Sequence, residues 1–120
     1  MTDRHAPSQR RLIWPPSPGW FKLRLVRGGW QVPAMICHHD QIGWWAVLDG
    51  EQFAPHDDPA HAPRVSDIWT GTIIDEATYD WLLAVKAWAR QHEPDHPCLS
   101  PTKPISHRRL IPHFAPQRTT

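Results

Sequence analysis

The sequence predicts an α+β fold, a small antiparallel meander of three to four strands packed by one C-terminal helix. Residues 20–37 alternate apolar and polar side chains on both sides of a Gly-Gly pair, which is typical of a β-hairpin. Between Asp75 and Pro94, apolar residues recur with the helical period instead. A partly closed, SH3-like barrel is the main alternative, because short twisted strands joined by tight turns can close on themselves.

The hairpin has a register that the pattern itself predicts. If Gly28-Gly29 forms a two-residue turn, one face carries only apolar pairs, namely Leu25 with Val32, Leu23 with Ala34, and Phe21 with Ile36. Lys22 and Arg24 then lie on the opposite, outward face. Because Pro33 has no backbone N–H, we expect the second strand at a sheet edge or at a bulge.

Further strands follow the hairpin. Residues 42–48 are apolar on both faces, which favours a central strand or one covered by the helix. Asp49-Gly50 predicts a second tight turn into a short strand at 51–53. We also expect a short strand around Ile68–Trp69, after a Pro-, His- and Asp-rich loop at 54–64.

The helix has both of its ends marked in the sequence. Asp75 occupies the N-cap position, and Pro94 stops the helix. The predicted core stripe, widened by Leu82 and Ala89, consists of Ala77, Trp81, Ala84, Val85 and Trp88. We assign Trp30, Trp69, Trp81 and Trp88 to the core.

Proline and charge divide the 120 residues into three parts. Ten of the 14 prolines lie within residues 1–18 and 94–120, so we expect a basic Pro-rich arm, a single domain at 19–93, and a basic Pro-rich tail. Residues 40–95 hold three basic and eleven acidic residues, whereas 96–120 hold four basic residues and no acid. The overall charge of +1 is therefore a cancellation, and the chain lacks the basic excess of a typical polyanion binder.

The composition also limits location and chemistry. No stretch is apolar enough for a membrane helix, and the first residues lack the apolar region of a secretory signal, so we expect a cytoplasmic protein that does not bind membranes. Two cysteines are too few for a disulfide scaffold. Phosphate-binding loops, nucleophile elbows and acidic metal triads are all missing from the sequence, which predicts a non-enzymatic protein without a cofactor.

A small zinc module is a third hypothesis. Cys37-His38-His39-Asp40 ends the second strand, and His92, His96 and Cys98 follow the helix. Four of these side chains could surround zinc tetrahedrally if Cys37 and His39 met the second group. The competing interpretation is a polar turn beside a half-buried thiol, since no CxxC or HExxH spacing is present.

Binding to another macromolecule is the leading hypothesis. Eight tryptophans exceed what a core of about 75 residues easily covers, and tryptophan is a favoured anchor in protein interfaces. We therefore expect another protein as the partner. Nucleic acid is the alternative, because basic residues near an exposed tryptophan suit phosphate contact with base stacking. The binding residues that we predict are Lys22, Arg24, Arg27, Trp45, Arg108 and Arg109.

Three stretches resemble small uncharacterised proteins encoded in phage and prophage regions of proteobacteria. They are GWFKLRLVRGGWQVPAMI at 19–36, WWAVLDGE at 44–51, and IDEATYDWLLAVKAWARQHEPDHP at 74–97, and the tail PTKPISHRR at 101–109 shares this style. The resemblance covers about two-thirds of the chain. It implies a cytoplasmic accessory role in a host cell, with a host or phage protein as the partner, and it brings no catalytic signature or site residues with it.

Overall fold

The computed structural model describes residues 14–105 and confirms the predicted α+β class. Five strands form an open antiparallel sheet in the order β4-β3-β2-β1-β5, so the closed-barrel alternative is not adopted. The strands are β1 (Gly19–Arg24), β2 (Gln31–His39), β3 (Gly43–Leu48), β4 (Glu51–Gln52) and β5 (Thr72–Ile74).

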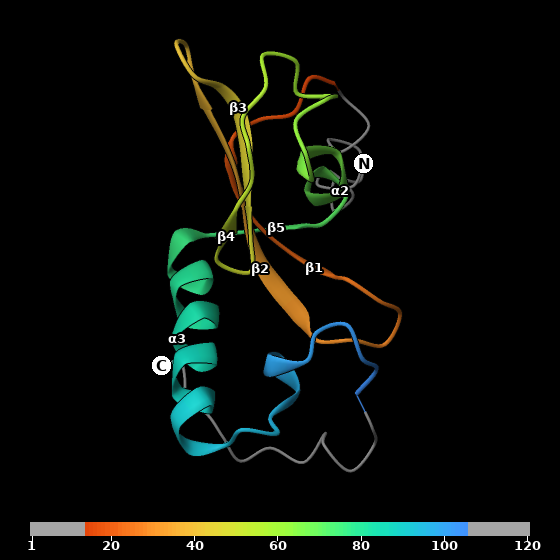
Figure 1. The fold of residues 1–120 in the computed structure, drawn as a ribbon, viewed down its shortest axis with the longest axis vertical. Coiled ribbons are helices and arrows are strands. Elements are labelled where there is room, and N and C mark those ends of the chain that lie inside the picture. Colours follow the sequence, from red (N-terminus) through yellow and green to blue (C-terminus); the bar gives the residue numbers. More distant parts are fainter. Residues whose placement is uncertain (1–13, 106–120) are drawn as a thin grey trace, which may run out of the picture.

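Helices cover both faces of this sheet (Figure 1). The short helix α2 (Val65–Trp69) packs on one face, where Phe21, Ile36 and Ile68 belong to a single buried cluster. The long helix α3 (Glu76–His92) lies on the other face, where its buried Val85 and Ala89 pack with Cys98 of the 3-10 helix η2 (Pro97–Leu99). The predicted single-helix architecture therefore gains a second, smaller helical layer.

The register of the predicted hairpin is wrong by two residues. Phe21 pairs with Ala34 and Leu23 with Val32, and residues 25–30 form a longer connection in which Leu25 is 36% exposed. The faces remain as predicted, because a shift of two residues restores the alternation of a strand. Gly29 serves a different purpose from the expected turn, since it forms a bridge with Pro104 and a Cβ there would lie 2.9 Å from the Pro101 carbonyl oxygen.

The position predicted for Pro33 is also wrong, because β2 lies in the middle of the sheet. The ladder between β2 and β3 ends at the pair Ala34 and Leu48, one residue short of Pro33. The Pro33 carbonyl accepts a hydrogen bond from the Asp49 N–H, so the missing N–H of Pro33 points to the turn after β3 rather than into the ladder. A central strand tolerates proline here for that reason.

The segment around Ile68–Trp69 is helical, contrary to the predicted strand. Val65, Ile68 and Trp69 are buried and recur at the spacing of one helical face, whereas two adjacent apolar residues alone do not distinguish helix from strand. The strand in this region is β5, which the sequence pattern does not predict and which pairs with β1 at the sheet edge. The other predicted strands and the Asp49-Gly50 turn are confirmed.

Helix α3 begins and ends as predicted. The Asp75 carboxylate accepts the Thr78 N–H at 2.8 Å, and Glu93 terminates the helix just before Pro94. Its buried face is rotated from the predicted stripe, because the buried residues are Tyr79, Leu82, Val85 and Ala89. Ala77 and Ala84 are exposed, and Trp81 and Trp88 are half-buried.

Ordered packing continues past residue 93. His96 and Cys98, both assigned to the tail by sequence, are 4% and 2% exposed. The Ile105 N–H donates to the Gly28 carbonyl, which holds the end of this segment against the β1–β2 connection. The predicted arm 1–18 is described from Trp14 onward, and the predicted tail as far as Ile105. None of the helices between these residues has the length and apolarity required to cross a membrane.

Candidate functional site: a cationic groove with two tryptophans

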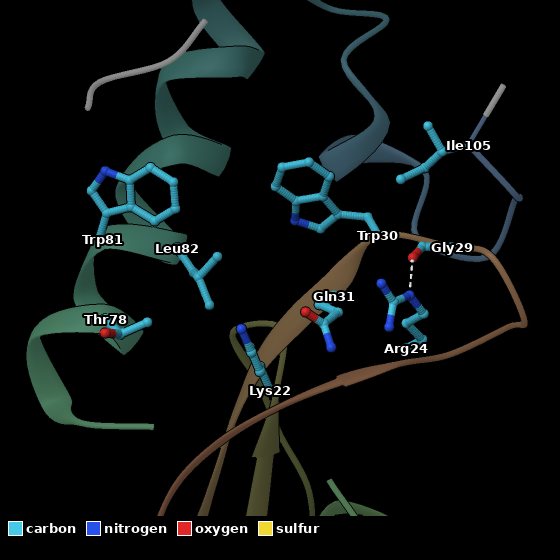
Figure 2. Close-up of a pocket in the computed structure, with 9 residues that line it drawn as sticks. All are labelled: Lys22, Arg24, Gly29, Trp30, Gln31, Thr78, Trp81, Leu82 and Ile105. Carbon is cyan, nitrogen blue, oxygen red and sulfur yellow. Dashed lines mark hydrogen bonds between the residues drawn. The ribbon is translucent and has the colours of Figure 1, made fainter. Parts of the chain in front are cut away.

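A groove opens between the sheet and the first half of α3, at the end of β1 and the start of β2. It has a volume of about 340 Å³, near the lower end of the range of roughly 300–1,000 Å³ seen for ligand pockets. We call it the β1–α3 groove, and it is lined by Lys22, Arg24, Gly29, Trp30, Gln31, Thr78, Trp81, Leu82 and Ile105 (Figure 2).

The sheet contributes the charge of this groove. Lys22 and Arg24 alternate on β1 toward the face that α3 covers, and Lys22 extends toward the helix (Figure 2). The Arg24 Nε donates to the Gly29 carbonyl oxygen at 3.0 Å, which orients the guanidinium. Neither cation forms an ion pair with a residue between 14 and 105. Two positive charges therefore face the groove, and no carboxylate of residues 14–105 forms an ion pair with either of them.

Two tryptophans supply apolar walls. Trp30 is the last residue of the β1–β2 connection, and Trp81 projects from the second turn of α3; both are half-buried. Trp30 is held edge-on against the buried His96 ring, with centroids 5.0 Å apart. Sequence reasoning assigned both residues to the core, and only Trp69 of the four tryptophans assigned there is fully covered. The number of tryptophans did indicate that the core could not cover all of them. It did not indicate which of them are only half-buried.

The other predicted binding residues lie elsewhere. Arg27 is exposed in the β1–β2 connection and does not line the groove. Trp45 is half-buried on the same sheet face, but it pairs with Cys37 whereas Lys22 pairs with Pro33. Standard strand spacings then separate the Cα atoms of Trp45 and Lys22 by roughly 16 Å. Arg108 and Arg109 lie outside the described residues.

The residues of the zinc hypothesis do not come together in the described part of the chain. From 14 to 105, the structure contains no group of three or more His, Cys, Asp or Glu side chains placed to hold a metal ion. His96 instead caps η2, since its Nδ1 accepts the Cys98 N–H at 3.0 Å, and His92 lies against the Trp88 ring. His39 is exposed near the end of β2, where its Nδ1 accepts the Gln41 N–H.

Both cysteines are free thiols. Burial raises the pKa of the Cys98 thiol to about 11, with the Asp49 charge adding to the shift. Burial also raises the pKa of the Cys37 thiol. Both shifts disfavour the thiolate, which is the reactive form in nucleophilic catalysis and in metal binding.

Comparison of the chain with protein-family models, curated proteins and solved structures finds no match.

Proposed function

We propose that this protein is a non-enzymatic accessory protein of phage or mobile-element type that binds a partner protein. The observation that carries the proposal is the β1–α3 groove, in which Trp30 and Trp81 stand beside Lys22 and Arg24. Tryptophan and arginine are the residue types that most often dominate the energy of protein interfaces. Half-buried indoles at the edge of a groove offer apolar area at a small cost in side-chain entropy.

The chemistry of the thiols supports the non-enzymatic part of the proposal. An attacking cysteine needs a lowered pKa, and burial moves the pKa of Cys37 and Cys98 in the opposite direction. The mobile-element origin and the cytoplasmic location rest on the resemblance of stretches 19–36, 44–51 and 74–97. Neighbouring genes that encode phage or mobile-element functions would support this origin, and an unrelated metabolic neighbourhood would count against it.

Affinity capture from host lysate with three forms of the full chain tests the binding surface. The forms are wild type, Trp81→Ala in the groove, and Trp45→Ala on the same sheet face outside it. We expect Trp81→Ala alone to lose a partner that the wild type retains, with thermal unfolding showing that both variants fold. Loss only with Trp45→Ala would move the surface to the β2–β3 hairpin. If no protein is retained specifically by the wild type, the proposed function is wrong.

Single-stranded nucleic acid is the second candidate, and the same groove favours it. Cations beside aromatic rings are the usual means of contacting phosphates while bases stack. The net negative charge of residues 14–105 argues against nucleic-acid binding, since this part of the chain holds seven basic and eleven acidic residues. A titration with mixed DNA and RNA at increasing salt separates the candidates, because phosphate contacts make the affinity fall steeply with salt. Tight, salt-dependent binding would favour nucleic acid over protein.

A further inference from the structure

We infer that the β1–α3 groove receives a short partner segment in which one or two carboxylates stand next to a large apolar side chain. This inference rests on the proposed function and names the chemistry of the partner. The supporting observations are the cations and tryptophans that line the groove, the basic charge of residues 1–13 and 106–120, and the volume of the groove.

The cations select for carboxylates. The Arg24 Nε donates to the Gly29 carbonyl, and its terminal guanidinium nitrogens form no ion pair with a residue between 14 and 105. A planar guanidinium held in one orientation binds a carboxylate through two parallel hydrogen bonds. Lys22, two residues earlier on the same strand face, adds a second positive charge. An acidic side chain entering here would meet both cations.

The tryptophans select for an apolar neighbour of that carboxylate. Trp30 and Trp81 approach the groove from different elements, and the buried Leu82 lies between them in the view of Figure 2. An aromatic or large aliphatic side chain placed against these indoles would remove apolar surface from water on both partners.

The charge of residues 1–13 and 106–120 does not complement the charge of the groove. Residues 1–13 hold three arginines against Asp3, and residues 106–120 hold three arginines and no acid. Neither end supplies the cluster of carboxylates that would complement Lys22 and Arg24. The charges favour an acidic segment from a partner.

Size and overall charge argue against a long polyanion. A groove of about 340 Å³ has room for one or two side chains and a short stretch of backbone. Asp75 at the N-cap of α3, and Glu76 and Asp80 in its first turns, are exposed and lie within three residues of the groove residue Thr78. These acids would repel phosphates that continue beyond the two cations.

Selection from a displayed library of random dodecapeptides against the full-length chain tests the inference. We expect the enriched peptides to carry Asp or Glu within a few positions of Phe, Trp or Leu. The affinity of an enriched peptide should fall about tenfold or more with Lys22→Gln or Arg24→Gln, because each variant removes a charge-assisted contact. Arg24→Lys should give an intermediate loss, since it keeps the charge and removes the planar donor pair.

Arg27→Gln is the matched control, because it removes the same charge from an exposed residue outside the groove. It should change the affinity by less than about threefold, as expected for a rim charge. Equal effects of Arg27→Gln and Lys22→Gln, or enriched peptides without acids, would overturn the inference. Displacement of the peptide by a thymidine dodecamer at equal concentration would also overturn it, in favour of nucleic acid. Loss of a captured partner with Trp81→Ala, together with neutral or basic enriched peptides, would leave the proposed function standing and reject only the acidic occupant.

Discussion

The Lys86 Nζ lies 2.8 Å from the Asp49 Oδ2 and 3.3 Å from the Asp49 carbonyl oxygen, so one side chain joins α3 to the turn between β3 and β4. The two side chains are only 19% and 16% exposed. Asp49 has a left-handed backbone (φ 54°), and Gly50 after it is also at positive φ (89°). The ion pair therefore connects the helix of one layer to the tightest turn of the sheet.

Removal of one member of this pair should destabilise the fold. We expect Lys86→Met to lower the free energy of unfolding by about 1–3 kcal/mol, because it leaves the Asp49 carboxylate covered and without its cation. Asp49→Asn tests the same charge without disturbing the turn, since asparagine tolerates the left-handed conformation. Urea unfolding of both single variants and the double variant gives the coupling energy.

The exposed pair of Arg64 and Asp67, with side chains 51% and 64% exposed at 3.4 Å, provides the control. Asp67→Asn should change the stability by less than about 0.5 kcal/mol, because solvent screens a surface pair. If Asp67→Asn costs as much as Asp49→Asn, the covered ion pair has no special role in holding α3.

The N-cap of α3 should also contribute measurably. Asp75→Ala removes the acceptor of the Thr78 N–H and should cost about 1 kcal/mol, whereas Asp75→Asn should retain most of the stability. Asp80→Ala, at an exposed position within the helix, controls for the loss of one negative charge. Thermal unfolding that ranks Asp80→Ala equal to Asp75→Ala would contradict the capping role.

Substitutions at Gly43 and Gly50 distinguish the cost of backbone strain from the cost of a steric clash. Both Gly43 (φ 102°) and Gly50 (φ 89°) have positive φ, but a Cβ at Gly43 would lie 2.6 Å from the His56 carbonyl oxygen, and one at Gly50 would meet nothing within 4 Å. Gly50→Ala should therefore cost about 1–2 kcal/mol from the backbone alone. Gly43→Ala should cost at least about 1 kcal/mol more, because β3 and the 53–56 segment must separate. Equal losses in denaturant unfolding would show that the segment moves freely.

Stability should decline at alkaline pH through Cys98. Its pKa rises from the ordinary value of 9.0 in the unfolded chain to about 11 in the folded one, so the folded state holds the proton longer. Above pH 9 the unfolded thiol ionises first and gains free energy, so stability is complete below pH 9 and falls between pH 9 and 11. Urea midpoints across this range should fall less in Cys98→Ala than in wild type. Parallel curves for the two proteins would exclude Cys98 as a source of the decline.

Much of the fold was predictable, because its signals are local. The Asp75 cap, the stop at Pro94 and the Asp49-Gly50 turn depend on residues within a few positions of each other, and all three are confirmed. The hairpin faces were predictable for the same reason. Its register was not, because Gly28 and Gly29 serve a contact with Pro104, and local pattern carries no information on that distant partner.

The candidate site was predictable only in part. The alternation of β1 placed Lys22 and Arg24 on one face, and the structure brings both into the groove. Trp45 was predicted as the accompanying aromatic because its face of the strand at 42–48 could supply an exposed tryptophan. That face extends over several strands, so a shared face does not imply proximity. Trp81 reaches the groove because the buried side of α3 is rotated, a consequence of how the helix packs on β1 and β2.

The sequence by itself determined the α+β class, the cap and stop of the helix, and the sorting of the hairpin into an apolar and a basic face, since each depends on neighbouring residues and short periodicities. The tertiary structure decided that α3 covers the basic face, that Trp30 and Trp81 stand beside Lys22 and Arg24, and that His96 and Cys98 are packed away from His39. The physical reason is that burial and proximity depend on which distant elements pack together. A change of one helical face or two residues of register is nearly silent in the sequence, yet it changes which side chains meet.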